Sequence, residues 1–494
     1  MGVNLCFQVA LVPLFLTYWS AKTYGAWLAL QAAYALITLI DAAHQAFLEN
    51  EFLTCGTHDR ARLRLALYSA LPISLLLGVA QIALLLCLYK VGAFGFITGL
   101  GDLASRDTQV QAFWVLLSWL MVYLFTLSPS GLLGRALSAL GYFSRFAWWG
   151  LLFVISSTLV PALVLLRGGD LLEVGIAQSV VTLIYHVPWF WDAANILRRE
   201  NVLPTTPSKQ IALANLKGAV YLLFKSLLEL SRQQGFRIVL TPLVGLQALA
   251  EFSTQRTVAN VALTGLNGVY GPLMPELMRY VRRRDQSKLE GAFAVLWGLL
   301  IAILCPLVLV LQAVMPVIYP IWTRGRFVFD GVLLCMISAS IVAYMLALPA
   351  MAICTGNNLV KVQLRIAASA ALVLFSTLPI SVHFMGLRGA GLSLLIAETV
   401  ALAGYVWQAA RWLNSAGLRW PRRSFRVGAY ASVSAVFGMM LIVLIPQMSV
   451  PLCSAFILIS MWMLLISWRS LPDSIKHTVR GQIHGRSQSI RNWY

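Results

Sequence analysis

Long apolar runs recur along nearly the whole chain, and this feature limits its fold more than any other. A helix needs about 20 apolar residues to cross the hydrocarbon core of a bilayer, and there it satisfies its backbone hydrogen bonds internally. The runs therefore predict an all-α polytopic membrane protein with about 14 transmembrane helices. They lie near residues 3–20, 25–48, 65–89, 111–130, 147–166, 173–194, 216–239, 251–275, 291–315, 330–353, 364–382, 387–408, 428–446 and 451–468.

The composition excludes a soluble enzyme. Of the 494 residues, 59% are apolar and only 11% are charged, less than half the charged fraction of an average soluble domain, which is about 25%. The segments between the runs are too short to hold an extramembrane catalytic domain. The sequence contains no P-loop, HExxH motif or Ser/His/Asp arrangement, and its seven cysteines are scattered without a CxxC pair. We therefore expect no enzyme activity, no metal site, no cofactor and no disulfide framework.

Lysine and arginine residues orient the predicted helices. A net charge of +19 would suggest nucleic-acid binding in a soluble chain, but here the basic residues lie in short loops, where their distribution sets membrane topology. Alternate loops together with the tail carry 26 of the 37 basic residues, the other loops carry seven, and four lie inside runs. This asymmetry predicts that both termini are cytoplasmic. Because no Lys or Arg precedes Lys22, the first run is expected to remain as a span and not to be removed as a signal peptide.

An internal repeat appears when the chain is shifted by 216 residues. Gly175 then falls on Gly391, and a shared W-x-A-A-x-x-L places 191–197 on 407–413. A repeating unit of six spans gives two copies of the same orientation, related by an axis along the membrane normal. The predicted domains are an N-terminal six-helix lobe (1–200), a C-terminal six-helix lobe (201–427), two additional helices (428–468) and a cytoplasmic basic tail (469–494).

Ionisable residues inside the runs are candidates for function, because each costs about 2.5–3.5 kcal/mol at the centre of a bilayer. In the seventh run, Lys225, Glu229 and Arg232 share one helical face. Arg237 lies off that face, and Arg256 follows in the eighth run. One interpretation is a binding site in which the four cations hold a phosphate-bearing ligand. The other is that Glu229 neutralises its neighbours while the outer cations extend to the membrane surfaces.

Isolated acidic residues are candidates for ion coupling. Asp41, Asp192 and Glu398 could titrate and couple transport to protons or sodium, as could Glu229 in the seventh run. Near the end of a span, however, an acid such as Asp41 or Asp192 can simply be solvated at the interface. The lone histidines His44 and His186 are interpreted as hydrogen-bonded structural groups.

Short motifs spread over nearly the whole chain resemble those of the polysaccharide and O-antigen flippases in the multidrug/oligosaccharidyl-lipid/polysaccharide (MOP) exporter superfamily. The matching residues are Val12-Pro13-Leu14, Tyr24-Gly25-Ala26-Trp27, Asp41 with Asn50, Phe252 with Arg256-Thr257 and Asn260, Pro275-Glu276, Thr355-Gly356-Asn357 and Gly389-Ala390-Gly391. The sequence departs from the family at Ala43, where a glycine is usual.

This resemblance implies a V-shaped pair of parallel six-helix lobes with two C-terminal helices added. It also implies alternating access, in which an oligosaccharide on undecaprenyl pyrophosphate moves from the cytoplasmic to the periplasmic leaflet of a bacterial inner membrane for surface polysaccharide biosynthesis. The family's basic cavity is represented here by Lys225, Arg232 and Arg256. Beyond the bilayer and this lipid-linked substrate, polysaccharide polymerase and export proteins are candidate partners, no nucleic acid is expected, and the chain is expected to be a monomer.

Two other functions compete with this interpretation. A multidrug exporter of the same superfamily would favour an acidic cavity for cationic drugs, and the surplus of Lys and Arg argues against it. A membrane-embedded polysaccharide polymerase or ligase would need a long periplasmic loop, which the predicted topology lacks.

Overall fold

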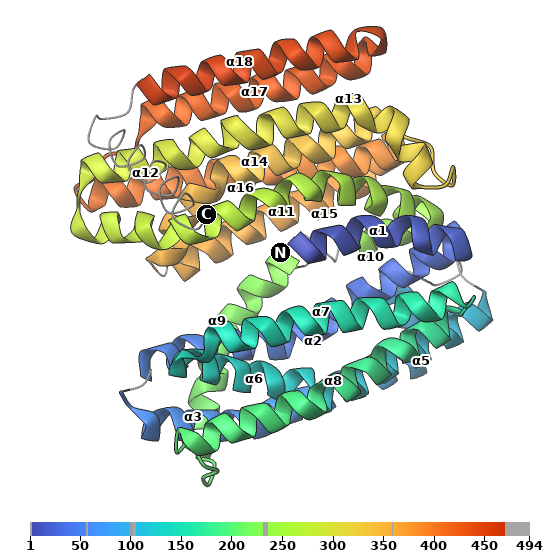
Figure 1. Ribbon diagram of the computed structural model, residues 1–494, viewed down its shortest axis with the longest axis vertical. Coiled ribbons are helices and arrows are strands. Elements are labelled where there is room, and N and C mark those ends of the chain that lie inside the picture. The colour runs from blue at the N-terminus through green and yellow to red at the C-terminus, as the bar shows by residue number, and fades with distance from the viewer. Residues whose placement is uncertain are drawn as a thin grey trace, which may run out of the picture. The chain divides into compact units, whose positions relative to one another are not determined.

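The computed structural model describes the backbone of residues 2–55, 58–98, 100, 105–230, 236–357 and 359–469, and in this part of the chain every regular element is a helix (Figure 1). The prediction of an all-α polytopic membrane protein is confirmed. The helices up to residue 244 are α1 (Gly2–Tyr18), α2 (Ala21–Cys55), α3 (Arg60–Lys90), α4 (Phe94–Thr98), α5 (Arg106–Phe125), α6 (Leu127–Leu137), the π-helical turn η1 (Ser138–Tyr142), α7 (Phe143–Leu166), α8 (Leu171–Arg199), α9 (Lys209–Leu230) and α10 (Phe236–Val244). The later ones are α11 (Leu246–Arg283), α12 (Gln286–Leu299), η3 (Leu300–Leu304), α13 (Cys305–Trp322), α14 (Gly331–Gly356), α15 (Val360–Met385), α16 (Leu387–Ser415), α17 (Arg422–Leu444), η4 (Pro446–Met448) and α18 (Ser449–Arg469).

Two compact units divide the chain. The N-terminal unit holds Cys6–Thr254 and Trp322–Phe327, and the C-terminal unit holds Gln255–Ile321, the described residues from Val328 onward and the described residues before Cys6. The predicted lobe boundary near residue 200 falls in the connection between α8 and α9. The helices α9 and α10, which follow that connection, pack against α2 and belong to the N-terminal unit.

The helix α2 is the centre of the N-terminal unit. It contacts α3, α5, α6 and α9, while α5 and α7 both pack against α8. Around one end of α2, fully buried side chains such as Leu48, Phe52 and Leu67 pack with Leu132 of α6 and Trp189 of α8. This apolar cluster fixes α2, α3, α6 and α8 relative to one another, so polar side chains on the neighbouring turns of α2 are held in fixed positions.

In the C-terminal unit, α16 packs against both α14 and α15, and α17 packs against α14 and α18. The helices α15 and α16 meet closely because α16 begins with small residues. A Cβ atom added to Gly389 would lie 2.0 Å from the carbonyl oxygen of Ser381. The backbone contact therefore requires glycine at this position.

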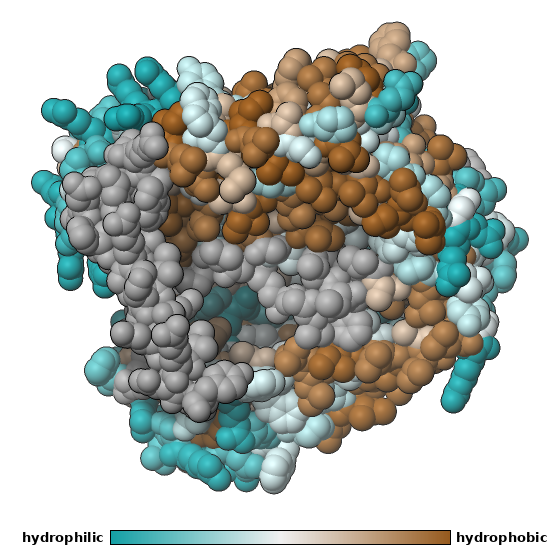
Figure 2. Space-filling view, turned by 45° about the horizontal axis from the view of Figure 1, so that its top comes forward, coloured by the Kyte–Doolittle hydropathy of each residue, from teal (hydrophilic) through white to brown (hydrophobic). Residues whose placement is uncertain are grey.

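Ten stretches of the described chain are long and apolar enough to cross a membrane, whereas the sequence predicts fourteen. The predicted spans near 111–130 and 147–166 are joined in one helical stretch, Arg106–Leu166. The helix α1 has only 17 residues. The helices α9 and α11, which cover the remaining two predicted spans, are not among the ten, and parts of both lie outside the described side chains. Figure 2 shows apolar side chains over the middle of each unit's visible surface and polar side chains towards its two ends, as expected for a membrane protein.

The helix bounds reproduce the repeat seen in the sequence. Both α8 and α16 have 29 residues, and their first residues, Leu171 and Leu387, are 216 positions apart. The preceding helices correspond too, since α7 packs on α8 as α15 packs on α16. In each unit an earlier helix, α5 or α14, also contacts the last helix of the pair. These parallels support a duplication of this three-helix segment.

The loop predicted at residues 131–146 is mostly helical, since α6 and the start of α7 occupy much of it. The two helices are separated by a kink at Gly141, whose φ of +97° is a non-helical conformation that glycine adopts without strain. The chain therefore changes direction at Gly141. Arg135 therefore lies within α6, close to the interior of the N-terminal unit.

Candidate functional site in the N-terminal unit

Polar residues gather on one face of α2. Asp41, Gln45 and Glu49 follow each other at intervals of four residues, which places them on one side of an α-helix. The side chains of Asp41 and Gln45 are buried, while Glu49 is about half exposed. The face therefore runs from the interior of the unit to its surface.

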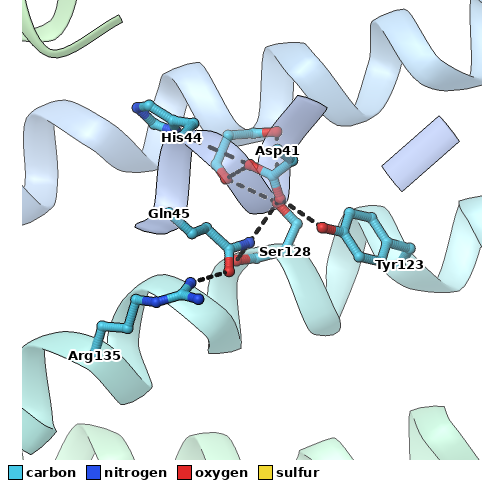
Figure 3. A network of polar contacts seen from close by, with 7 residues as sticks. Asp41, His44, Gln45, Tyr123, Ser128 and Arg135 are labelled. Atoms are coloured by element: carbon cyan, nitrogen blue, oxygen red, sulfur yellow. Dashed lines mark hydrogen bonds and ion pairs between the residues drawn. The ribbon is translucent and has the colours of Figure 1, made fainter. Parts of the chain in front are cut away.

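Asp41 is completely buried, and its carboxylate is held by donors from three helices (Figure 3). The amide of Gln45 donates to Oδ2 at 2.7 Å, and the hydroxyl of Tyr123 on α5 donates to the same oxygen at 2.9 Å. The hydroxyl of Ser74 on α3 donates to Oδ1. Ser128 of α6 completes the network, because its hydroxyl lies 2.9 Å from that of Ser74 and its carbonyl accepts from Gln45 at 3.2 Å. These donors replace the water that a carboxylate loses on burial.

The helix break between α5 and α6 positions two of these groups. Thr126 leaves helical geometry with φ −123° and ψ −76°, and its hydroxyl donates back to the carbonyl of Val122 at 2.5 Å. Tyr123, before the break, donates to Asp41, and Ser128, after the break, contacts Ser74 and Gln45, which both donate to Asp41.

Arg135 connects this network to the surface. Its guanidinium donates to Oε1 of Gln45 at 2.7 Å and to the carboxylate of Glu49 at 3.0 Å. Gln45 thus bridges a buried carboxylate and a half-buried cation, donating to one and accepting from the other. Arg135 therefore contacts Asp41 only through this amide. Among the described residues, Asp41 forms no direct ion pair with an arginine or a lysine.

His44 lies next to Asp41 on α2. It is 1% exposed, and its Nδ1 lies 4.0 Å from Oδ1 of Asp41, beyond hydrogen-bonding distance. Neither ring nitrogen has a hydrogen-bond partner in the described structure. The interpretation of His44 as a hydrogen-bonded structural group is therefore wrong.

His186 is a hydrogen-bonded structural group, as the sequence predicts. Its Nδ1 lies 2.7 Å from the carbonyl oxygen of Thr182, which can only accept, so this nitrogen carries the proton. The Nε2 atom lies 3.2 Å from the hydroxyl of Ser130. Both polar positions of the ring are satisfied by neutral partners.

Two cavities border the network. One, of about 470 Å³, is lined by Gln45, Glu49 and Arg135 together with His186 and aromatic residues of α7 and α8. The other, of about 310 Å³, is lined by Tyr34 among other residues, and the Tyr34 ring packs edge-on against that of Tyr123 at 6.1 Å. The Asp41 network thus has a cavity on the Gln45 side, where Gln45, Glu49 and Arg135 meet a largely apolar lining, and a second cavity beyond Tyr123.

Most of the predicted cationic site lies outside the described residues. Lys225 and Glu229 belong to α9 and Arg237 to α10, but their side chains lie outside the described part, as does the whole of Arg232. Arg256 is half-buried on α11, in the C-terminal unit.

The other two acidic candidates differ in setting. Glu398 is half-buried on α16. Asp192 is buried and forms two hydrogen bonds with Arg145, at 2.9 and 2.5 Å, and a third with the indole of Trp149 at 2.8 Å. These bonds join α7 to α8, so Asp192 is a structural residue and not a free interfacial acid.

Comparison with known proteins identifies the fold. No protein-family model matches the sequence, and no curated protein does. A multidrug resistance MATE family transporter of the MOP superfamily, solved in an inward-facing conformation, matches with a TM-score of 0.62 at 15% identity, over 84% of this chain and 96% of that one. The lipid II flippase MurJ, in an inward closed conformation, matches with a TM-score of 0.61 at 15% identity, over 93% of this chain and 96% of that one. A MOP superfamily transporter from Pyrococcus furiosus, described as having a binding pocket of reversed polarity, matches with a TM-score of 0.56 at 14% identity, over 84% of this chain and 94% of that one. The chain therefore has the fold of the MOP-superfamily transporters.

Proposed function

We propose that this protein flips an oligosaccharide linked to undecaprenyl pyrophosphate from the cytoplasmic to the periplasmic leaflet of a bacterial inner membrane. The observation that carries the proposal is the structural match to a lipid flippase over nearly the full length of both chains. Pyrophosphate and sugar groups cannot cross hydrocarbon unaided, because each unpaired polar group costs several kcal/mol there.

The extent of the matches supports a lipid-linked substrate. The flippase covers 93% of this chain, whereas the multidrug transporter covers 84%. The difference corresponds to about the combined length of α17, with 23 residues, and α18, with 21 residues. The sequence predicts these two helices as an addition to a twelve-helix core.

In this proposal, Lys225, Arg232, Arg237 and Arg256 bind the pyrophosphate, with the arginines pairing its oxygens and the lysine acting as a point charge. A membrane potential that is negative inside favours outward movement of an anion by about 2.3 kcal/mol per charge for each 100 mV. Voltage alone could therefore drive the flip, and coupling of a cation or proton through Asp41, Glu229 or Glu398 is the competing source of energy.

Multidrug export is the second candidate function, because the structure of a multidrug transporter matches with a TM-score of 0.62. A strain that lacks the gene separates the two functions. If the protein is the proposed flippase, lipid-linked repeat units accumulate in the inner membrane and a glycosidase reaches their sugars only in inside-out vesicles. Unchanged repeat units with increased sensitivity to cationic drugs would instead identify an exporter.

A further inference from the structure

A basic pocket lies in the C-terminal unit where α16 ends and α17 begins. It has a volume of about 460 Å³ and an open side, and it is far along the chain from the Asp41 network. It is lined by Glu290, Ala410, Asn414, Arg419, Trp420, Pro421, Arg422, Arg423 and Ser424. Three arginines and one glutamate give this lining a net positive charge.

The pocket is built on a fixed loop. The side-chain amide of Gln286 on α12 holds the backbone of Arg419 at two points, accepting from its N–H at 2.8 Å and donating to its C=O at 3.1 Å. The same amide donates to Glu290 at 2.6 Å, which holds this carboxylate at the edge of the pocket. The loop that carries Arg419 is therefore tied to α12.

Aromatic packing fixes the next residue of the loop. The indole of Trp420 packs against Phe293 at 5.3 Å, Trp297 at 5.7 Å and Phe425 at 5.8 Å between ring centroids. Trp297 is itself almost fully buried. These contacts hold the wall of the pocket in place before a ligand binds, which lowers the entropy cost of binding.

The three guanidinium groups are available to a ligand. In the described structure no carboxylate forms an ion pair with Arg419, Arg422 or Arg423. Glu290 lines the same pocket but is occupied by Gln286. The pocket also lies at the end of two candidate spanning helices, at the level where lipid headgroups meet the protein.

We propose that this pocket binds a phosphate group, supplied at this depth of the membrane by the headgroup of an anionic phospholipid. Guanidinium groups match phosphate oxygens in geometry and charge, and basic pockets between spanning helices bind such headgroups. Glu290 opposes the ligand's charge and weakens its binding. The proposal does not depend on which substrate the protein transports.

The test is lipid binding to the purified full-length protein in detergent, measured by native mass spectrometry with phosphatidylglycerol and, separately, with phosphatidylcholine. We expect preferential binding of phosphatidylglycerol by the wild type. The Arg422→Gln/Arg423→Gln variant should bind it at least about tenfold more weakly, since a hydrogen bond to a charged group contributes about 1.5–3 kcal/mol. Glu290→Gln should bind it more tightly, and this gain cannot arise from misfolding.

The control is Arg198→Gln/Arg199→Gln, which removes the same charge from the exposed end of α8 and should bind phosphatidylglycerol like the wild type. Equal losses in the two double variants, or unchanged binding in Arg422→Gln/Arg423→Gln, would overturn the proposal.

A separate titration uses inorganic phosphate. Binding of inorganic phosphate without preference for phosphatidylglycerol would assign the pocket to a soluble ligand and overturn the lipid source.

Discussion

A carboxylate in the interior of a candidate spanning helix needs neighbours that replace water, and Asp41 has them on three helices. Ser74, Tyr123 and Gln45 donate to its two oxygens. The next cation, Arg135, acts only through Gln45. Such a network stabilises the folded unit while it keeps a carboxylate buried near two cavities, so the same residues contribute to stability and are candidates for coupling.

Removal of one donor should destabilise the protein. Tyr123→Phe keeps the ring but leaves Asp41 without one hydrogen bond, and we expect a loss of about 1–3 kcal/mol, typical of an unsatisfied buried polar group. Thermal unfolding of the purified protein in detergent measures this change. Tyr430→Phe is the control, because Tyr430 is 64% exposed on α17, and an equal melting temperature in the two variants would contradict the role of Tyr123.

A transport assay tests whether the carboxylate of Asp41 couples ion movement to flipping. If the carboxylate couples ion movement to flipping, Asp41→Asn should keep the protein folded but abolish the dependence of transport on a proton or sodium gradient. A flipping assay in vesicles, with and without an imposed gradient, measures this. A variant that responds to the gradient like the wild type would leave voltage as the driving force and exclude Asp41 from coupling.

At the scale of helices, the positions of apolar runs were predictable because they depend on local composition. Each predicted span falls on one or more described helices, apart from a few residues at helix ends and breaks and from residues 231–235 of the seventh, which lie outside the described chain. The continuation through 131–146 was not predictable, because Arg135 resembles a loop residue until its partners Gln45 and Glu49 are known. The spacing of Asp41, Gln45 and Glu49 was available as a signal, but Ser74, Tyr123 and Ser128 are common polar residues whose contacts depend on tertiary packing.

The start of α14 depends on Asp330, whose side chain accepts from the backbone amides of Val332 at 3.0 Å and Leu333 at 3.2 Å and from Arg388 of α16 at 2.7 Å. Asp330→Ala should cost about 0.5–2 kcal/mol for the cap, in addition to the ion pair. Arg388→Gln removes only the exposed ion pair, worth about 0–1 kcal/mol. Thermal unfolding compares the two, and a larger loss in Arg388→Gln would contradict the capping role.

The close contact between α15 and α16 at Gly389 predicts the effect of a larger side chain there. Gly389→Ala places a methyl group against the carbonyl of Ser381 and should destabilise the protein by about 1–3 kcal/mol, as overpacking does. Gly150→Ala on α7 is the matched control, because its added methyl group meets nothing within 4 Å, and alanine favours a helix by up to about 1 kcal/mol. Denaturation of both variants in detergent checks the contrast, and a neutral Gly389→Ala would show that the two helices separate easily.

At the scale of the whole molecule, the repeat found in the sequence matches the arrangement of the helices. The match of α8 to α16 in length and spacing, and their equivalent packing partners, extend the short W-x-A-A-x-x-L identity to a three-helix segment. The fold was predictable from apolar runs, basic loops and family-like motifs. The substrate was not, because the fold of these transporters serves both drug and lipid export, and the distinction depends on the charges of a few side chains.

The most direct test of the account is a flipping assay with the purified protein in lipid vesicles that contain an undecaprenyl-pyrophosphate-linked oligosaccharide. A membrane-impermeant glycosidase should reach about half of the sugars in protein-free vesicles, since two leaflets share the lipid equally, and nearly all of them when the wild type is present. The variant in which Lys225, Arg232 and Arg256 are changed to Gln should return access to the protein-free level. A control that changes Arg198, Arg199 and Lys209 to Gln should flip like the wild type. Wild-type vesicles that expose no more sugar than protein-free vesicles would contradict the proposed function, and full activity of the first triple variant would contradict the cationic site.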